Sequence, residues 1–112
     1  MGDDQLQPER RELWKGLVEL RRLPDSQLLR GWAGAFTWIV TWASNSAEFR
    51  NRTELLATSL GLYVLGIEGE HPIQPDGYTT VTEEIAEMIE RAAGNPDAIL
   101  HGTFHTYRHN DA

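Results

Sequence analysis

The sequence predicts an all-α fold, a compact bundle of about five helices packed around one central apolar helix. Three observations lead to this prediction. Apolar residues recur at helical spacing along five segments, residues typical of helix ends separate these segments, and the chain of 112 residues has the length of a single domain. The predicted helical domain spans residues 8–109, between flexible ends at residues 1–7 and 110–112.

The first predicted helix spans residues 8–23. Leu13, Leu17 and Leu20 fall on one face of a helix drawn through this segment, and Pro24 ends it. The acidic residues near its start and the arginines near its end suit the helix dipole.

The second predicted helix spans residues 26–43 and admits another interpretation. Residues 36–42 (FTWIVTW) are rich in β-forming types and alternate as a strand would. On a helix, the apolar residues of the whole segment cover an arc of roughly 220° at 100° per residue. We favour the helix because its periodicity begins before Phe36 and nothing breaks the chain there. A helix that is apolar over so wide an arc is expected to be central.

The third predicted helix spans residues 46–67 and carries two apolar stripes. The main stripe runs from Phe49 to Ile67, while Leu55 and Leu62 form a second stripe roughly 120° away. This second stripe must be covered inside the bundle or by another subunit. A loop over residues 68–79 follows, because this segment contains two prolines and a Pro-Asp-Gly turn.

The fourth predicted helix spans residues 81–93. Thr80 and Glu83 have the spacing of a capping box, and Gly94 supplies a C-terminal stop. Apolar residues recur along it at helical spacing, so one face is expected to be buried.

The fifth predicted helix opens at the Asn-Pro-Asp sequence of residues 95–97. A strand over residues 103–109 is the alternative, because glycine and threonine weaken the helical pattern there. If both 36–42 and 103–109 are strands, the fold class becomes α+β.

The composition excludes several kinds of chemistry and of partner. There is no cysteine, so disulfides, thiol catalysis and thiolate metal sites are excluded. The formal net charge is −7, from 10 Lys and Arg against 17 Asp and Glu, which disfavours nucleic acid and anionic membranes as partners. The N-terminus lacks the pattern of a signal peptide, and the longest apolar run, residues 32–43, is too short to span a bilayer. We therefore expect a cytoplasmic protein that has no membrane partner.

Motifs of the common enzyme classes are missing from the sequence. No serine lies in a Gly-x-Ser-x-Gly elbow, and neither a phosphate-binding glycine loop nor a His-Glu-x-x-His zinc motif occurs. Glu83, Glu87 and Glu90 align at helical spacing, but we interpret them as a solvated face that aids solubility. No catalytic residue is predicted.

Three histidines near the C-terminus form the candidate metal site. His101, His105 and His109 are spaced by four, which places them on one face of a helix, where two imidazoles can share zinc or another divalent metal. Two helical turns separate the outer pair by about 12 Å, so a site would use two of the three histidines and a carboxylate from elsewhere. The alternative interpretation is a polar, partly solvated face.

The leading functional hypothesis is a small acidic, non-enzymatic protein-binding module that acts as an adaptor, regulator or inhibitor. The predicted binding residues are Trp38, Gly34, Leu55 and Leu62, because two apolar helices present more apolar surface than one bundle needs. The expected partner is a second copy of the chain or another protein. The alternative is a metal-binding protein or metal-dependent enzyme that uses the histidine face.

Overall fold

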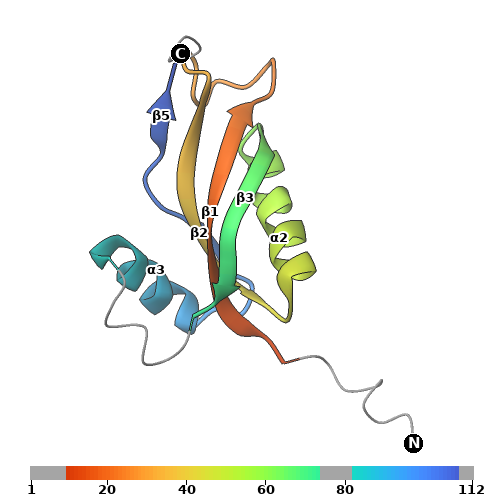
Figure 1. Ribbon diagram of the computed structural model, residues 1–112, viewed down its shortest axis with the longest axis vertical. Helices are drawn as coiled ribbons and strands as arrows, with labels where there is room; N and C mark the ends of the chain where they lie inside the picture. Colours follow the sequence, from red (N-terminus) through yellow and green to blue (C-terminus); the bar gives the residue numbers. More distant parts are fainter. Residues whose placement is uncertain (1–9, 74–81, 109–112) are drawn as a thin grey trace, which may run out of the picture.

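Residues rich in β-branched and aromatic types build the centre of the molecule as strands. The computed structural model describes residues 10–73 and 82–108. Within them, five strands form one sheet and two helices pack against it (Figure 1). The elements in chain order are β1 (Glu12–Arg22), β2 (Gly34–Ala43), α2 (Ser46–Ser59), β3 (Leu62–Pro72), α3 (Glu83–Ala93), β4 (Ile99–His101) and β5 (His105–Tyr107).

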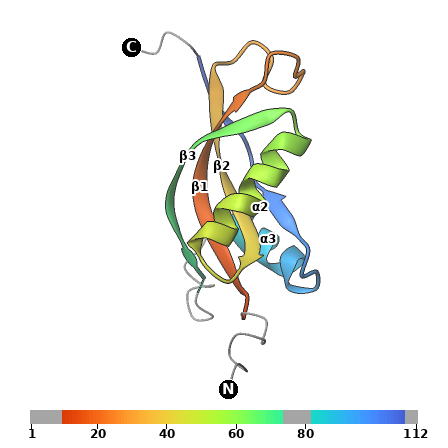
Figure 2. The ribbon, with the colours of Figure 1, turned by 90° about the vertical axis from the view of Figure 1, so that its right-hand side faces the viewer.

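The strand β2 lies at the centre of the sheet. It pairs with β1 along one edge, and β1 pairs with β3, so the strand order is β3-β1-β2-β4 with antiparallel neighbours. The other edge of β2 pairs with β4 at residues 39–41 and with β5 at residues 34–36. The C-terminal part of the described chain therefore returns along β2, and β3 is left at the opposite border of the sheet (Figure 2).

Both faces of the sheet are covered, but to different extents. The helix α2 crosses one face, while α3 packs against one end of the other face (Figures 1 and 2). The buried residues form two clusters accordingly. Val18, Ile39 and Phe49 belong to the cluster under α2, and Val40 and Met88 belong to the cluster under α3.

The prediction of an all-α bundle is wrong, because the described residues form an α+β fold whose segments 12–22 and 34–43 are strands. The physical reason is that these strands contribute buried residues to both faces of the sheet. A strand that is buried on both faces lacks a simple alternation of apolar and polar residues. In β1, Leu13 and Leu20 join opposite clusters, although their spacing of seven would place them on one face of a helix.

The strand interpretation of residues 36–42 is the correct one. Ile39 and Val40 are both buried, and they belong to the clusters on opposite faces. Thr41 is also fully buried, on the face that α2 covers. Its hydroxyl donates a hydrogen bond to the carbonyl of Ala98 at 2.7 Å and accepts one from Nε of Arg52 at 3.0 Å. The central position predicted for this segment therefore belongs to a strand.

The predicted third helix is too long. The helix α2 ends at Ser59, and the chain turns at Gly61, whose φ of +76° lies in the region that favours glycine. The strand β3 then begins at Leu62. The predicted second stripe does not exist, because Leu55 lies on α2 with 66% of its surface exposed while Leu62 is fully buried in the sheet.

The predicted loop at 68–79 is also wrong in part, because β3 continues through residues 68–72. A sharp φ of +64° at Gly69 and the shift in register beside it show how glycine accommodates the irregular part of this strand. Residues 74–79 of the predicted loop lie outside the described residues.

The fourth predicted helix is confirmed as α3, with Gly94 as its C-cap. Thr82 is its N-cap, and the Oγ1 atom of Thr82 accepts a hydrogen bond from the backbone N–H of Ile85 at 3.3 Å. The predicted capping box begins at Thr80, which lies outside the described residues.

The fifth predicted helix is wrong. The segment contains two three-residue strands, β4 and β5, separated by residues 102–104, and each pairs with a different part of β2. The alternative strand at 103–109 overlaps β5 at residues 105–107 only, and residue 109 is outside the described residues. The two predicted flexible ends, 1–7 and 110–112, are also outside them. No helix in the described part of the chain is long and apolar enough to cross a membrane.

Two positions on α2 test the direction in which this helix faces. Phe49 is fully buried under the sheet, so Phe49→Ala should reduce the free energy of unfolding by about 3–5 kcal/mol. Leu55 is largely exposed on the same helix, so Leu55→Ala should change it by less than about 0.5 kcal/mol. Urea denaturation monitored by tryptophan fluorescence measures both values. Equal losses in the two variants would contradict the packing of α2 described above.

Candidate functional site

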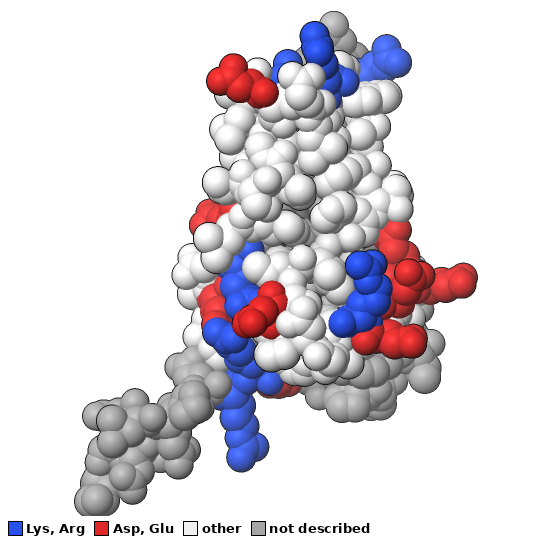
Figure 3. Space-filling view, turned by 180° about the vertical axis from the view of Figure 1, so that it is seen from behind, with Lys and Arg blue, Asp and Glu red and all other residues white. Residues whose placement is uncertain are grey.

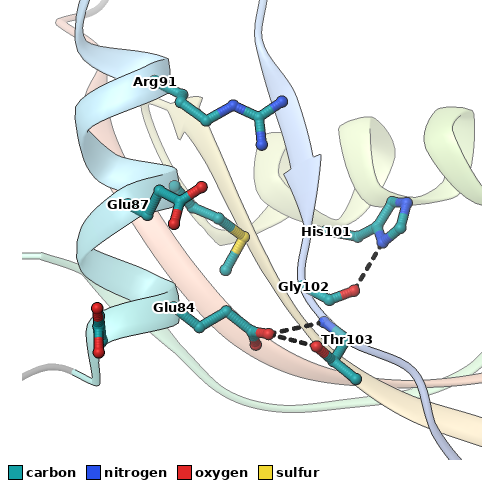
Figure 4. A pocket seen from close by; sticks show the side chains of 8 residues that line it. Glu84, Glu87, Arg91, His101, Gly102 and Thr103 are labelled. Atoms are coloured by element: carbon teal, nitrogen blue, oxygen red, sulfur yellow. Dashed lines mark hydrogen bonds between the residues drawn. The ribbon is translucent and has the colours of Figure 1, made fainter.

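An open pocket of about 490 Å³ lies between α3 and the segment that follows β4 (Figure 4). Its lining is mostly charged or polar. The lining residues are Glu83, Glu84, Glu87, Met88, Arg91, His101, Gly102 and Thr103.

The helix α3 positions the acidic side of the pocket. Its apolar side chains, Ile85 and Met88 among them, pack into the cluster on the sheet, which turns the acidic side chains outward. Glu83 and Glu87, which the sequence predicted to be a solvated face, line the pocket, whereas Glu90 is exposed and does not.

Glu84 connects the two sides of the pocket. Its carboxylate accepts hydrogen bonds from the hydroxyl of Thr103 at 2.5 Å and from the backbone N–H of Thr103 at 3.1 Å (Figure 4). The hydroxyl bond and the backbone bond, in that order, lower the pKa of Glu84, and the neighbouring His105 and His101 add to this effect. The carboxylate is therefore ionised, and its two hydrogen bonds to Thr103 hold residues 102–104 against α3.

Gly102 leaves room for the carboxylate of Glu84 beside Thr103. A Cβ atom at residue 102 would collide with the carboxylate of Glu84. The backbone N–H of Gly102 also donates a hydrogen bond to the carbonyl of Trp38 at 2.9 Å, which fixes the segment to β2. A side chain at this position would therefore require the carboxylate of Glu84 to shift.

The histidines do not gather as the metal hypothesis requires. The ring of His101 points away from Glu87 and Arg91 (Figure 4) and stacks on Phe104 with ring centroids 4.7 Å apart. His105 is exposed on β5, and His109 lies outside the described residues. Because His101 and His105 lie on separate short strands, the helical spacing that motivated the hypothesis does not apply to them.

No group of three or more possible protein ligands for a metal occurs among residues 10–73 and 82–108. The metal hypothesis therefore stays a prediction from sequence.

The four predicted partner-binding residues do not form one surface. Leu55 is exposed on α2, and Leu62 is buried on β3. Gly34 is buried beneath the ring of Tyr107. Trp38 is half-buried next to the cluster under α3, with Nζ of Lys15 lying 5.2 Å from its ring centroid.

A polar network that the sequence analysis missed fixes the C-terminal strand to the sheet. The hydroxyl of Tyr107 donates a short hydrogen bond to the carboxylate of Glu19, and Nε of Arg21 donates to the Tyr107 oxygen at 3.4 Å. Burial and the bond to Glu19 raise the pKa of Tyr107, and the bond to Tyr107 raises the pKa of Arg21. No local pattern reveals this network, because 86 and 88 positions separate the paired residues.

The network lies on a part of the sheet that α3 does not reach. Figure 1 shows α3 beside the lower part of the sheet, with only β5 higher up on that side. Leu17 and Phe36 on this uncovered part belong to neither buried cluster. On β3, where Tyr63 pairs with Arg21, Tyr63 and Leu65 expose 42% and 47% of their surfaces.

The strand β3 is a long edge strand. Its 11 residues run beside β1, with register shifts at Leu65 and at residues 69–70, and no other described strand lies along its outer side (Figure 2). Residues 62–67 (LYVLGI) contain no charged residue and no proline, whereas Glu68, Glu70 and Pro72 occupy the second half. An edge strand without these residues is a template for pairing with another chain.

The opposite edge of the sheet is a poorer template. It consists of β4 and β5, which have three residues each. Seen from behind, the charged side chains gather at the top and in the lower part of the molecule, and the upper middle is uncharged (Figure 3). Very short edge strands limit pairing with another chain even where no charged residue protects the edge.

Comparison with known proteins assigns no function to this chain. No family model matches the sequence, and neither the curated proteins nor the solved structures contain a significant match.

The lowered pKa of Glu84 predicts how the stabilisation from its hydrogen bonds to Thr103 depends on pH. Because the folded-state pKa is lowered, the stabilisation is present above the usual pKa of a glutamate, about 4.3, and is lost as the pH falls through the lower folded value. Glu84→Gln should therefore lower the melting temperature at pH 7, with a difference from the wild type that shrinks toward zero near pH 3.

Glu83→Gln is the matched control, because the side chain of Glu83 lines the same pocket without a hydrogen bond to Thr103. It should leave the melting temperature nearly unchanged at both pH values. If the difference in melting temperature between Glu84→Gln and the wild type stayed constant from pH 7 to pH 3, the stabilising role of the ionised Glu84 carboxylate would be contradicted.

Proposed function

We propose that this protein is a non-enzymatic protein-binding module that accepts an extended polypeptide segment along the outer edge of β3. The observation that carries this proposal is the uncharged stretch 62–67 on an edge strand of 11 residues. Addition of a strand to an exposed sheet edge is a common mode of peptide recognition, in which main-chain hydrogen bonds supply affinity and alternate side chains supply specificity.

The neighbouring side chains support an apolar ligand segment. Tyr63 and Leu65 alternate with Val64, which packs against the cluster under α2, so Tyr63 and Leu65 lie on the face that α2 does not cover. On that face they lie beside Arg21 and Glu19 of β1, which hold the hydroxyl of Tyr107. An extended segment with apolar residues at alternate positions would cover Tyr63 and Leu65 while it pairs with the backbone of β3.

Composition supports the rest of the proposal. The absence of cysteine is in keeping with a cytoplasmic location. The net charge of −7 favours a protein partner over nucleic acid or an anionic membrane.

A proline in β3 tests the proposal. We expect peptides selected from a displayed library on the immobilised wild type to be apolar at alternate positions. They should bind Val64→Pro at least about tenfold more weakly, because that variant loses its N–H and the ring obstructs pairing. Val64 directs this N–H to the outer edge, because the N–H of Leu23 donates to the carbonyl of Gly61 and the direction alternates along the paired residues 62–64. Proline is tolerated on an edge strand where the N–H faces away from the sheet, so the variant should fold. Peptide affinity is measured by fluorescence anisotropy.

Glu83→Pro provides the matched proline control. Glu83 is the first residue of α3, a position that accepts proline, and it is remote from β3 in the fold. This variant should bind the selected peptides as the wild type does. Peptides that bind Val64→Pro and the wild type equally, or a selection that yields no peptide, would contradict the proposed function.

A further inference from the structure

Glu68 lies on the same face of the sheet as the exposed Tyr63. In the pairing of β3 with β1, Tyr63 is opposite Arg21, and Glu68 is opposite Leu17. Side chains that are opposite each other on paired strands share a face, and alternate residues of β1 share one as well. Tyr63 and Glu68 therefore both lie on the face that α2 does not cover, one on each side of the shift in register at Leu65.

The carboxylate of Glu68 has no partner within the described part of the chain. Glu68 is exposed, and it makes neither a hydrogen bond nor an ion pair with any other described residue. Glu70 differs, because it lies 3.6 Å from Nη2 of Arg50 on α2 and accepts a hydrogen bond from the hydroxyl of Ser46 at 3.4 Å. His71 directs Nδ1 to a backbone carbonyl at 2.7 Å. The charge of Glu68 is therefore left uncompensated on the edge strand.

The cations of β1 on this face are engaged elsewhere. Nζ of Lys15 lies 5.2 Å from the ring centroid of Trp38 on β2. Nε of Arg21 donates to the hydroxyl oxygen of Tyr107 on β5. Both side chains thus contact groups on the side of β1 away from β3, and neither forms an ion pair with Glu68.

An uncompensated carboxylate beside an open backbone edge selects among extended segments. A segment that pairs along β3 would remove part of the water around Glu68, which costs free energy unless an opposite charge replaces that water. Opposite charges on neighbouring strands stabilise a sheet, whereas like charges destabilise it. The net charge of −7 also attracts basic segments over a longer range. The edge can therefore discriminate by repulsion of acidic segments as well as by attraction of basic ones.

We infer that the segment bound at the edge of β3 carries a lysine or arginine that pairs with Glu68, to one side of the apolar residues that cover Tyr63 and Leu65. This inference rests on the proposed function, because it names the class of segment that the same edge binds. Glu68 is then a specificity-determining residue, and the backbone of β3 supplies the affinity that segments have in common.

Fluorescence anisotropy with the peptides selected on the wild type tests the inference. We expect these peptides to carry a basic residue to one side of their apolar residues. Replacing this residue with glutamate in the peptide should weaken binding to the wild type at least about fivefold. Glu68→Lys should reverse the preference, so that the peptide with glutamate binds this variant more tightly than the original peptide does.

Glu54→Lys is the matched control. It makes the same change of net charge at an exposed residue of α2, which covers the opposite face of the sheet, and it should keep the preference of the wild type. Raising the ionic strength from about 0.1 M to about 1 M shortens the screening length from about 10 Å to about 3 Å, so the preference should shrink. Near-ultraviolet circular dichroism of the four tryptophans checks that each variant is folded.

The outcomes separate the inference from the proposed function. If peptides bind the wild type and not Val64→Pro, but show no preference for a basic residue or keep it in Glu68→Lys, the inference is overturned and the proposed function stands. A selection that yields no peptide overturns both.

Discussion

Burial of the central strand on both of its faces is the constraint on which the rest of this fold depends. Ile39 and Val40 are neighbours in β2, yet each is almost completely buried in a different apolar cluster. Only a layer on each side of the sheet can achieve this, so the chain supplies one helix for each face. Thr41 is fully buried as well, and its hydroxyl is satisfied by Ala98 and Arg52, which links β2 to α2 and to the segment before β4.

The two helices cover the sheet unequally, and this inequality creates the candidate functional surface. The helix α2 crosses its face, whereas α3 packs against only one end of the other face. Tyr107, Glu19 and Arg21 provide polar contacts on the part that α3 leaves uncovered. Farther toward the border, Tyr63 and Leu65 remain exposed next to the outer backbone edge of β3. Apolar side chains and unpaired edge groups thus occur together on one strand.

The pocket beside α3 has a different character. Its best-defined interaction, between Glu84 and Thr103, is internal and holds the end of β4 in place. The ring of His101 is turned away and stacks on Phe104. The acidic side chains of α3 therefore form mainly a solvated face, with one carboxylate, that of Glu84, in a structural role. The edge of β3 is better supported as a binding site than this pocket.

The sequence by itself determined the local features of this protein. The helix at residues 83–93, its glycine cap and the stripe that it buries follow from helical periodicity, because only one face of α3 meets the sheet. The alternation at residues 36–42 was visible as well, but an apolar segment buried on both faces satisfies helical and strand patterns alike. Composition excluded thiol chemistry without any knowledge of the fold.

Only the tertiary structure decided which strands are central and which residues meet. Leu13 and Leu20 reach opposite clusters because helices from distant parts of the chain cover both faces of β1. Tyr107 meets Glu19 through a pairing that spans most of the sequence. The candidate edge exists because β3 pairs with β1 and ends the sheet, which depends on strand order and not on the residues of β3 alone. Long-range pairing of this kind leaves no periodicity in a single segment, and this is why the sequence did not reveal it.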